Sequence, residues 1–560
     1  MTVTLNKIIK EELEKIFVLL QKENLVDLKI QFKNLNFNIT EPAQNNEMLK
    51  KYEYATNFAF ILKKYSSRSI LELAQFIVDK LNKVQLNSQK LFKDIHIAMP
   101  GFINMSFNDV AFKFVLQNVL QTAHGYGAKQ TNHLDNIKPI NVEYVSANPT
   151  GFLHVGHARG AAIGDSLVRI MRYFGHKVTA EYYINDAGNQ IDVLVVSTRV
   201  RYNELFNIQM PMPEDCYRGH DIIWLAKKIK NQYQDKFLNN FDENYWEFRS
   251  ICVNMLLEKI KSDLKNLDIE FDLFSSELAI YKSGQIDKAI ERLHEHIYKK
   301  DGAIFLKTTT FGDDKDRVLV KSDGNLTYFT PDIAYHLQKL SQSSKLINIW
   351  GADHSGYIAR MSIALQALGF SEDIMYVLVV QLVRLIKDGS EFKMSKRAGT
   401  SVTLDDLLSV SSKDAIRFMM VTRDSNTKFD FDIDQSNSNS QNNPVFSVQY
   451  AHSRACSILA KAQNLNLNYN FSFSEYPKIR KLILQLDLFP ELVKTITQTY
   501  KVQLMTSYLI ILANLYNSFY SEHKIIGSEH ESSLLTLTKA TQTVLQIGLN
   551  LIGVSAPEKM

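Results

Sequence analysis

The chain of 560 residues carries 64 Lys and Arg against 60 Asp and Glu, a net charge of +4, and 45% of its residues are hydrophobic. At roughly 100–200 residues per domain this length predicts three or four domains, and the composition excludes a disordered or fibrous protein. The three cysteines, Cys216, Cys252 and Cys456, lie far apart without a CxxC pair. They exclude a disulfide framework and a zinc ribbon and suit a reducing cytosol.

The sequence indicates neither a membrane span nor a targeting segment. Its longest apolar run falls well short of the roughly 18 residues that a spanning helix needs. Glu11, Glu12 and Glu14 stand near the start, where signal and transit peptides lack acidic residues. We therefore expect a cytoplasmic protein with no membrane partner.

The net charge is unevenly placed. Residues 1–120 hold 16 basic and 12 acidic side chains, whereas the remaining 440 residues hold 48 of each. The sequence pI of 8.5 lies below the value of about 9 above which nucleic-acid-binding domains are typically found. Global charge alone therefore predicts no nucleic-acid partner, and a solvated surface is the simplest interpretation.

The first predicted element is an amphipathic helix near the N-terminus. One face gathers apolar residues at helical spacing, namely Leu5, Ile8, Ile9, Leu13, Ile16, Phe17 and Leu20. Further on, Pro100 and Gly101 precede residues 102–105 (FINM), which have the alternation of a strand. These elements predict a mixed α+β domain at residues 1–120.

A βαβ unit follows. Residues 139–146 predict a strand, 148–151 a turn, 155–174 a helix and 177–184 a second strand. Two parallel strands joined by a crossover helix begin a nucleotide-binding sheet.

The rest of the chain extends this sheet and then becomes helical. The predicted elements are a strand at 345–350, a helix at 357–368, a buried strand at 375–385, a polar loop or linker at 434–443, and helices at 414–421 and 493–519. We expect an α/β domain at residues 121–403 and an all-α domain at residues 404–560.

The first chemical motif is HVGH, residues 154–157, at the start of the crossover helix. A helix N-terminus presents free N–H groups and partial positive charge, which suits polyphosphate. His154 and His157 can donate hydrogen bonds to phosphate oxygens, and Gly156 permits a close approach by a base or ribose. Gly156, Gly160 and Gly164 recur at every fourth residue and predict a flat helix face against the sheet. A chance match is the alternative for so short a string.

The second motif is KMSKR, residues 393–397, followed by Ala-Gly-Thr. Two lysines three residues apart before a glycine indicate a cationic loop that can close over a departing pyrophosphate. Alone, such a cluster is more often a solvated surface.

Together the two motifs resemble the signature pair of class I aminoacyl-tRNA synthetases, and the wider sequence resembles the arginyl-tRNA synthetases. The matching segments are NVEYVSANPTGFLHVGHARG (141–160), EYYINDAGNQI (181–191), WGADHSGY (350–357), FKMSKRAGT (392–400), DAIRF (414–418), VQYAHSR (448–454), PGFIN (100–104) and GLNLIGVSAPEKM (548–560). The KMSK loop is intact here, whereas many arginyl enzymes have a degenerate one, and DAIR stands where DALR is more usual.

The resemblance implies a Rossmann-like catalytic core, an N-terminal domain that contacts the tRNA elbow and a helical anticodon-binding bundle. It implies that the chain activates L-arginine with ATP, in the company of Mg²⁺ but without a dedicated protein metal site, and transfers it to tRNA(Arg) as a monomer. Because no protein nucleophile is needed, catalysis would depend on positioning and charge stabilisation.

The resemblance also assigns residue roles. His154, His157, Lys393 and Lys396 are the expected catalytic residues. The expected ATP-binding residues are Ala147, Asn148, Pro149, Thr150, Gly151, Phe152, Leu153, His154, Val155, Gly156, His157, Asp353, His354, Met394 and Ser395. The expected arginine-binding residues are Glu143, Asn148, Tyr328 and Asp332, since a guanidinium prefers carboxylates in a fork. Which of Glu143 and Asp332 contacts which positive charge stays open.

For tRNA, the resemblance points to Tyr450, His452 and Arg454, because aromatic rings and guanidinium planes stack on unpaired bases. A tyrosine in a helix is more often part of the core.

Two other functions compete with this one. The first is an adenylylating enzyme of the same superfamily that acts on another amino acid or a small acid. The helical C-terminal part and DAIRF argue against it. The second is a catalytically silent RNA-binding homologue, against which the intact HVGH and KMSKR motifs argue.

Overall fold

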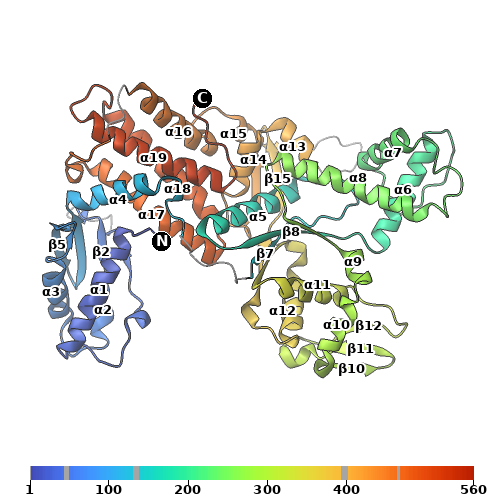
Figure 1. Ribbon diagram of the computed structural model, residues 1–560, viewed down its shortest axis with the longest axis horizontal. Helices are drawn as coiled ribbons and strands as arrows, with labels where there is room; N and C mark the ends of the chain where they lie inside the picture. Colours follow the sequence, from blue (N-terminus) through green and yellow to red (C-terminus); the bar gives the residue numbers. More distant parts are fainter. Residues whose placement is uncertain (1, 43–48, 130–137, 393–401, 463–466) are drawn as a thin grey trace.

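A five-stranded parallel sheet lies at the centre of the molecule (Figure 1). The computed structural model describes residues 2–42, 49–129, 138–392, 402–462 and 467–560. The strands are β7 (Ile140–Glu143), β8 (Val178–Ile184), β9 (Leu273–Ser276), β13 (Lys345–Gly351) and β14 (Met375–Val380). Their order is β14-β13-β7-β8-β9, and every neighbouring pair is parallel. The predicted parallel sheet is therefore confirmed.

Strand β7 is shorter than the sequence predicted. Val145 and Ser146, inside the predicted strand, adopt positive φ angles of 68° and 40°, which lie outside the strand region. The chain therefore leaves the sheet directly after Glu143 and turns toward the crossover helix.

The crossover helix α5 spans Val155–Phe174, as predicted, and ends at Gly175 in the left-handed conformation, φ 100°. Gly164 packs so closely that an added Cβ would stand 2.3 Å from the ring of Tyr144, but a Cβ on Gly160 would meet no atom within 4 Å. The predicted three-glycine face is therefore wrong at Gly160. Four residues of an α-helix turn through 400°, so each glycine in such a row lies 40° around the helix axis from the previous one. The row therefore does not stay on the face that packs against the sheet.

Helices and a smaller sheet surround this core. The elements are α6 (Asn189–Glu204), α7 (His220–Tyr233), α8 (Tyr245–Asn266), α9 (Glu277–Lys282), α10 (Gln285–Arg292), β10 (Ile297–Lys300), β11 (Ala303–Leu306), β12 (Arg317–Val320), α11 (Phe329–Gln342), α12 (Ile358–Ala367) and α13 (Leu404–Val410). Helices α6, α7 and α8 form a separate lobe at the right of Figure 1, and strands β10, β11 and β12 form an antiparallel sheet below the core.

The predicted strand at residues 375–385 is two strands in different sheets. After β14 the chain turns at Leu382, whose side chain is exposed, and enters β15 (Val383–Lys387). This strand pairs with β16 (Ser390–Glu391) and with β17 (Phe429–Asp432). Apolar residues continue from β14 across Leu382 to Val383 and Leu385 of β15, so the hydrophobic run does not reveal where one sheet ends.

The C-terminal part is a helical bundle. Its helices are α14 (Lys413–Met420), α15 (Ile433–Asn437), α16 (Pro444–Lys461), α17 (Pro477–Thr499), α18 (Gln503–Glu522) and α19 (Glu531–Leu551). The single helix predicted at 493–519 is wrong, because Tyr500 takes a left-handed conformation, φ 59°, and separates α17 from α18. The polar stretch 434–443, predicted as a loop, begins inside α15, which the side chain of Asp432 caps.

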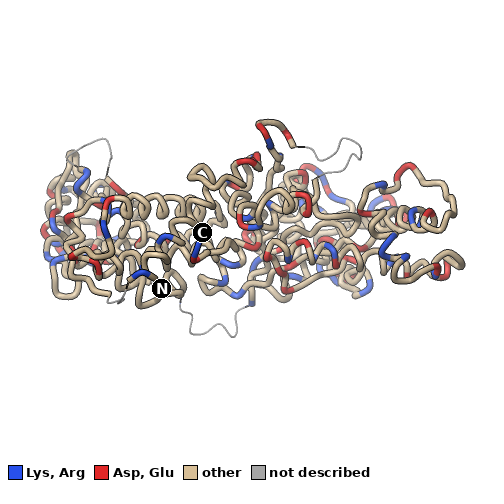
Figure 2. The backbone as a smooth tube through the Cα atoms, turned by 90° about the horizontal axis from the view of Figure 1, so that it is seen from above, with Lys and Arg blue, Asp and Glu red and all other residues tan. Residues whose placement is uncertain are grey.

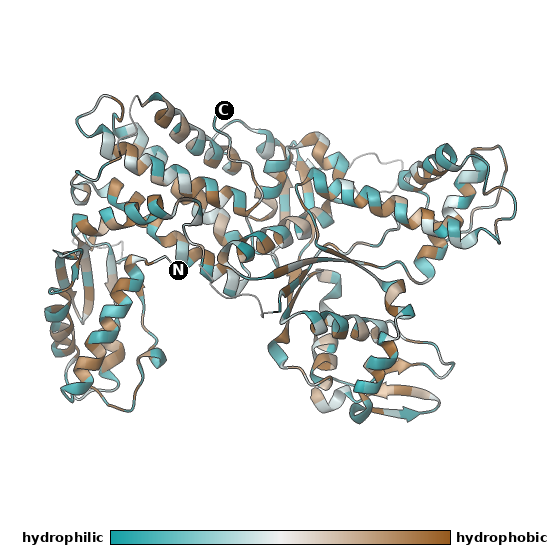
Figure 3. Ribbon diagram, viewed as in Figure 1, coloured by the Kyte–Doolittle hydropathy of each residue, from teal (hydrophilic) through white to brown (hydrophobic). Residues whose placement is uncertain are grey.

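The N-terminal part is the expected α+β domain. Its elements are α1 (Leu5–Lys22), β1 (Ile39–Thr40), β2 (Tyr54–Thr56), α2 (Phe58–Lys63), α3 (Ile70–Leu81), β3 (Gln85–Leu86), β4 (Gln89–Lys90), β5 (Phe92–Ala98), β6 (Phe102–Phe107) and α4 (Asp109–Thr122). An antiparallel sheet of order β1-β2-β6-β5 packs against the helices. All seven predicted apolar positions of α1 except Ile8 are buried, and Ile8 packs partly against the same core. Brown and teal positions alternate along the helices in Figure 3, as expected when each helix buries one face.

This domain is held to helix α17 by buried polar contacts. Arg480 forms an ion pair of 2.5 Å with Glu53, and both side chains are largely buried. The carboxylate of Asp487 accepts a hydrogen bond of 2.9 Å from the backbone N–H of Leu5. Burial raises the pKa of Asp487 to about 7.

Arg417 of α14, in the DAIRF motif, connects the catalytic core to the C-terminal end of the chain. Its side chain has no exposed surface and forms an ion pair with Asp165 of α5. It also donates hydrogen bonds to the carbonyl oxygens of Leu267 (2.8 Å) and Ile552 (3.0 Å). A Cβ on Gly553 would lie 2.1 Å from the guanidinium, so this position requires glycine.

No helix within the described ranges has the length and apolar character needed to cross a membrane.

We predict that Arg417→Ala lowers the free energy of unfolding by about 3–5 kcal/mol, because the buried Asp165 then keeps only Arg169 as a cationic partner and the carbonyls of Leu267 and Ile552 lose their donor. Thermal and urea unfolding followed by circular dichroism measure the change.

Arg384→Ala is the matched control. Arg384 pairs with Asp430 at 2.7 Å, but the two side chains are 64% and 47% exposed. An exposed pair contributes about 1 kcal/mol or less. Equal losses in the two variants would contradict the role given to the buried pair.

Candidate active site

The loops that follow the parallel strands meet at one edge of the central sheet. The chain adds β8 and β9 on one side of β7 and then returns to place β13 and β14 on the other side. The strand order therefore reverses between β7 and β13, and ligands of open α/β sheets bind outside the carboxyl ends of strands at such a point. The segment ending in HVGH follows β7, and the segment from Ala352 to Tyr357 follows β13.

The two histidines of HVGH lie against each other at the first turn of α5. Their ring centroids are 3.8 Å apart. His154 is the N-cap residue and its Nδ1 accepts the N–H of Gly156 at 3.1 Å, while Nδ1 of His157 accepts the N–H of His154 at 3.1 Å. Burial lowers the pKa of His154, and burial followed by the nearby His154 lowers that of His157 to about 3. Both rings are therefore neutral near pH 7, with the proton on Nε2 as the remaining donor.

The loop before the helix is fixed by its neighbours. The hydroxyl of Tyr182 donates to the carbonyl of Ala147 at 2.7 Å, and the amide of Asn148 donates to Gln190 at 2.6 Å. A Cβ on Gly151 would stand 2.4 Å from a carboxylate oxygen of Asp221, so this turn needs glycine. Phe152 packs edge-on against Trp224, with ring centroids 5.4 Å apart.

The chain after KMSKR pairs with the start of α5. Lys393, Met394, Ser395, Lys396 and the rest of residues 393–401 lie outside the described residues. Directly after them, the carbonyl of Val402 accepts the N–H of Val155 at 3.1 Å, and the N–H of Leu404 donates to the carbonyl of Leu153 at 2.8 Å. Thr403 forms an antiparallel bridge with His154. The chain that resumes at Val402, five residues after the last residue of KMSKR, therefore lies beside HVGH.

A pocket of about 410 Å³ lies beside the segment after β13. It is lined by Tyr328, Asp332, Asp353, His354, Gly356, Tyr357 and Arg360. Asp332 is half-buried and accepts a hydrogen bond of 2.7 Å from the hydroxyl of Tyr357. Burial and then the charge of Glu143 raise the pKa of Asp332 to about 6, although Tyr357 acts in the opposite direction. Tyr328 and Asp332 line the same pocket.

Glu143, which was expected to bind arginine, is paired with a lysine of the protein itself. It is buried and forms an ion pair of 2.7 Å with Lys339, which is also buried. The hydroxyls of Tyr335 and Ser146 donate to its two oxygens at 3.0 and 3.1 Å. Burial favours the neutral acid, but Lys339 and the other nearby groups hold the pKa of Glu143 below its usual value. Its charge is therefore already compensated within the protein.

A carboxylate that the sequence analysis missed, Glu277, belongs to the same edge. It is the first residue of α9, directly after β9, and it is buried. Burial, then the charges of Asp332 and Asp186, raise its pKa to about 7. In the amide orientation that satisfies both of its atoms, Asn185 donates to Glu277 at 2.6 Å. No motif marks Glu277; its position after a strand of the sheet was the available signal.

The three expected tRNA contacts divide into two groups. Arg454 lies over the rings of Tyr450 and Tyr520, at 4.5 and 4.4 Å from their centroids, and Tyr450 is 39% exposed. His452 has no exposed surface, and its ring lies against the carbonyl of Pro557 and the amide of Gln542, each at 2.9 Å. A ring so enclosed cannot contact a base, so the prediction for His452 is wrong.

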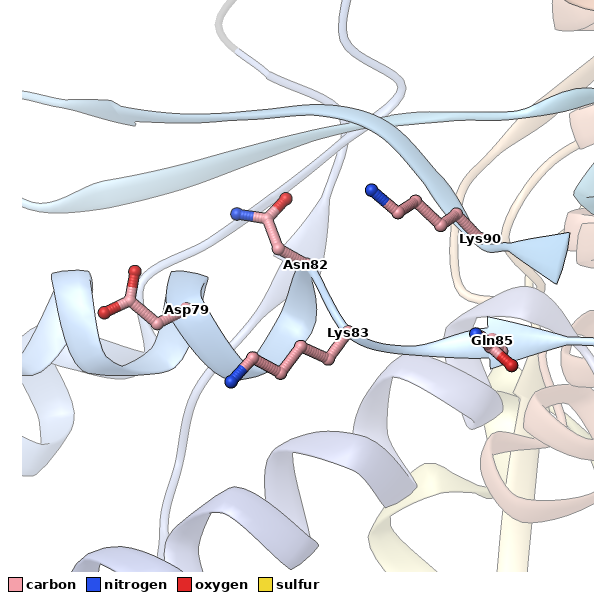
Figure 4. A pocket seen from close by; sticks show the side chains of 5 residues that line it. All are labelled: Asp79, Asn82, Lys83, Gln85 and Lys90. Carbon is pink, nitrogen blue, oxygen red and sulfur yellow. The ribbon is translucent and has the colours of Figure 1, made fainter.

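A second pocket, of about 600 Å³, lies on the N-terminal domain, far along the chain from the motifs (Figure 4). Asp79, Asn82 and Lys83 come from the end of α3 and the turn after it, while Gln85 and Lys90 come from β3 and β4. All five side chains are exposed. This pocket is a solvated surface hollow that contains two of the basic residues of the charge surplus.

The described part of the chain contains no group of three or more His, Cys, Asp or Glu side chains that could hold a metal ion.

Three family models match the chain in succession. The arginyl tRNA synthetase N terminal domain matches residues 4–107, the catalytic domain of tRNA synthetases class I (R) residues 115–454, and the DALR anticodon binding domain residues 448–560.

Known proteins give the same result. The chain is 44% identical to the arginine--tRNA ligase of Mesomycoplasma hyopneumoniae strain 232 over 94% of this chain and 98% of the relative. It is 44% identical to the arginine--tRNA ligase of Bacillus subtilis over 91% of this chain and 92% of the relative. The solved Thermus thermophilus arginyl-tRNA synthetase shares the fold, with a TM-score of 0.74 and 20% identity over 99% of this chain and all of that one. Since a catalytic-domain model matches more than half of it and close relatives span nearly all of it, the chain belongs to the arginyl-tRNA synthetases of class I.

Proposed function

We propose that this chain is an arginine–tRNA ligase. It activates L-arginine with ATP to arginyl-adenylate and pyrophosphate, and then transfers the arginyl group to the terminal adenosine of tRNA(Arg). The observation that carries the activation step is the pairing of residues 153–155 with 402–404, which brings the chain that follows the KMSKR motif beside the HVGH helix. The family relationship and the acidic pocket support arginine as the amino acid.

In the first step the arginine carboxylate attacks the α-phosphorus of ATP, and pyrophosphate leaves. His154 and His157 each have a free Nε2–H to donate to phosphate oxygens, since their Nδ1 atoms already accept backbone N–H groups. The free N–H groups at the start of α5 add partial positive charge. Lys393 and Lys396 would offset the charge that accumulates on the leaving pyrophosphate. Asp353 and His354 would border the adenylate.

We assign the guanidinium of arginine to Asp332 and Glu277 rather than to Glu143. Burial raises the pKa values of Asp332 and Glu277, and neither carboxylate has a cationic partner among the described residues. Glu143, in contrast, is neutralised by Lys339. A guanidinium placed between them would favour both ionised forms. Asn148 at the end of the first loop and Tyr328 at the pocket rim complete the expected set.

The three parts of the chain divide the remaining work. Residues 121–403 would carry the chemistry, residues 404–560 would bind the anticodon with Tyr450 and Arg454 as stacking platforms, and residues 1–120 would contact the tRNA elbow. The three successive family models support this division. The protein would act as a cytoplasmic monomer.

The direct test is ATP–pyrophosphate exchange with arginine, with and without tRNA. We expect exchange with arginine only when tRNA is present, as is typical of this family, and charging of tRNA(Arg). Exchange with lysine or another amino acid in place of arginine would refute the assigned specificity, and no exchange under any condition would indicate a catalytically silent homologue.

We predict that arginine binding weakens by about tenfold between pH 7 and pH 5. A carboxyl with a pKa of about 6 is mostly ionised at pH 7 and mostly protonated at pH 5, and only the ionised form attracts the guanidinium. Isothermal titration of the full chain with arginine measures the dissociation constant.

Asp332→Asn should raise that constant by roughly 30- to 100-fold at pH 7 and remove the part of its pH dependence that belongs to Asp332, leaving the part that belongs to Glu277, while ATP binding stays nearly intact. A dissociation constant that does not change with pH, or equal losses for arginine and ATP, would contradict the assignment.

We also predict that the double variant Lys83→Ala/Lys90→Ala weakens tRNA binding several-fold and lowers its salt dependence, with the KM for arginine unchanged. Each phosphate contact that is lost reduces the salt slope by about one. The measurement is the KM for tRNA at several salt concentrations.

Lys299→Ala/Lys300→Ala removes the same two charges from exposed positions on β10 and is the matched control. Equal effects in both double variants would mean that total charge, and not the surface hollow of Figure 4, matters.

A further inference from the structure

Tyr183 of β8 stands at the arginine-binding edge, but neither the motifs nor the assignments above use its side chain. Its backbone N–H donates to the hydroxyl of Ser146 at 3.1 Å, and that hydroxyl donates to Glu143. Its ring packs against the ring of Tyr335, with centroids 4.3 Å apart. The ring is therefore held firmly in place beside the carboxylates.

The hydroxyl of Tyr183 is buried and makes no hydrogen bond to any group in the part of the chain that the structure describes. A buried polar group without a partner costs about 1–3 kcal/mol. The neighbouring tyrosines avoid this cost: Tyr182 donates to the carbonyl of Ala147, and Tyr335 donates to Glu143 and Glu181. Most buried polar side-chain atoms have a hydrogen-bond partner, so the unpaired hydroxyl of Tyr183 is an exception.

Its surroundings indicate which ligand would satisfy it. Burial raises the pKa of the Tyr183 phenol well above its usual range, and the charges of Glu277, Asp332 and Glu143 raise it further. Three other tyrosine hydroxyls are also buried without a partner among the described residues, namely those of Tyr54, Tyr144 and Tyr516. Neither Asp332 nor Glu277 contributes to the pKa shift of these tyrosines. The Tyr183 oxygen thus lies where a cation with several N–H donors would be drawn in.

A guanidinium fits this arrangement better than an ammonium ion. It carries five N–H donors in a plane, while one oxygen of Asp332 already accepts from Tyr357 and Glu277 already accepts from Asn185. The phenolic oxygen of Tyr183 can accept one of these N–H groups in addition to the two carboxylates.

We propose that the Tyr183 hydroxyl is a specificity-determining group that accepts a hydrogen bond from the guanidinium of bound arginine. This proposal rests on the proposed function, because it assigns a third contact within the same arginine pocket. It makes Tyr183 a direct substrate contact, held in position by Tyr335 and Ser146.

The test is Tyr183→Phe, which removes the hydroxyl and keeps the ring against Tyr335. Isothermal titration of the full chain measures the binding of arginine and of agmatine, which is arginine without its carboxylate. We expect both dissociation constants to rise at least tenfold by the same factor, because the lost contact is to the guanidinium that the two ligands share. The KM for ATP should not rise and the melting temperature should not fall, since the removed hydroxyl had no partner among the described residues.

Tyr182→Phe is the matched control on the same strand. Its hydroxyl supports the carbonyl of Ala147, so its loss should lower the melting temperature and affect arginine and ATP alike. Unchanged arginine binding in Tyr183→Phe would overturn the proposal. Weaker binding of arginine with unchanged binding of agmatine would also overturn it, by placing the contact at the amino-acid end.

Failure of the proposed function gives a different result. If the wild-type chain binds arginine but neither supports exchange nor charges tRNA, the ligase assignment fails, while the titration still tests Tyr183. If the wild-type chain binds neither arginine nor agmatine, both proposals fail.

Discussion

The ion pair between Arg417 and Asp165 is the constraint on which the arrangement of the catalytic and C-terminal parts depends. Asp165 lies on α5, the helix that begins with HVGH, and Arg417 lies on α14, beyond the end of the α/β core. A second buried arginine, Arg159, holds the other half of α5 by donating to the carbonyls of Gln381, Asp424 and Thr427. The helix that presents the histidines is thus fixed at two points by the chain that follows the KMSKR segment. Positioning groups without a protein nucleophile requires such rigidity, since small displacements of the reacting groups reduce the rate strongly.

The same physics makes the pocket proposed for arginine electrostatically unfavourable when it is empty. Asp332 is half-buried, Glu277 is buried, and neither has a cationic partner among the described residues. Their pKa values are therefore raised, so the protein binds a proton at Asp332 more tightly when folded than when unfolded. A carboxyl whose pKa is raised on folding lowers stability as the pH rises toward and through about 6, and the full cost is present above that value. A bound guanidinium removes this cost. The pocket therefore gains affinity from a charge imbalance that destabilises the empty protein, whereas the Glu143–Lys339 pair next to it contributes no such attraction.

The sequence predicted local structure well where one periodicity decided it. The predicted helix 155–174 has the bounds of α5, and the sequence predicted the strands of the parallel sheet except β9, although with other ends for β7 and β14. It failed where the decision belonged to tertiary contacts. The apolar run 375–385 could not show that Leu382 turns outward between two sheets, and nothing in the sequence alone reveals that Lys339 neutralises Glu143 or that Pro557 covers His452. Glu277 was also missed because of a tertiary contact. It follows β9, which pairs with β8 although β9 lies more than 90 residues further along the chain.

Pairing inside the protein also explains why net charge was a poor guide to the RNA partner. Arg417 with Asp165, Arg480 with Glu53 and Lys339 with Glu143 are all withdrawn from the surface, and each pair cancels in the total without acting on solvent. Basic and acidic residues alternate along the whole molecule in Figure 2. A polyanion responds to the exposed charges within a Debye length of about 8 Å, and not to the sum over the chain. Exposed lysines such as Lys83 and Lys90 can therefore act on phosphates in a chain of net charge +4, and the near balance elsewhere favours release of the charged tRNA after each turnover.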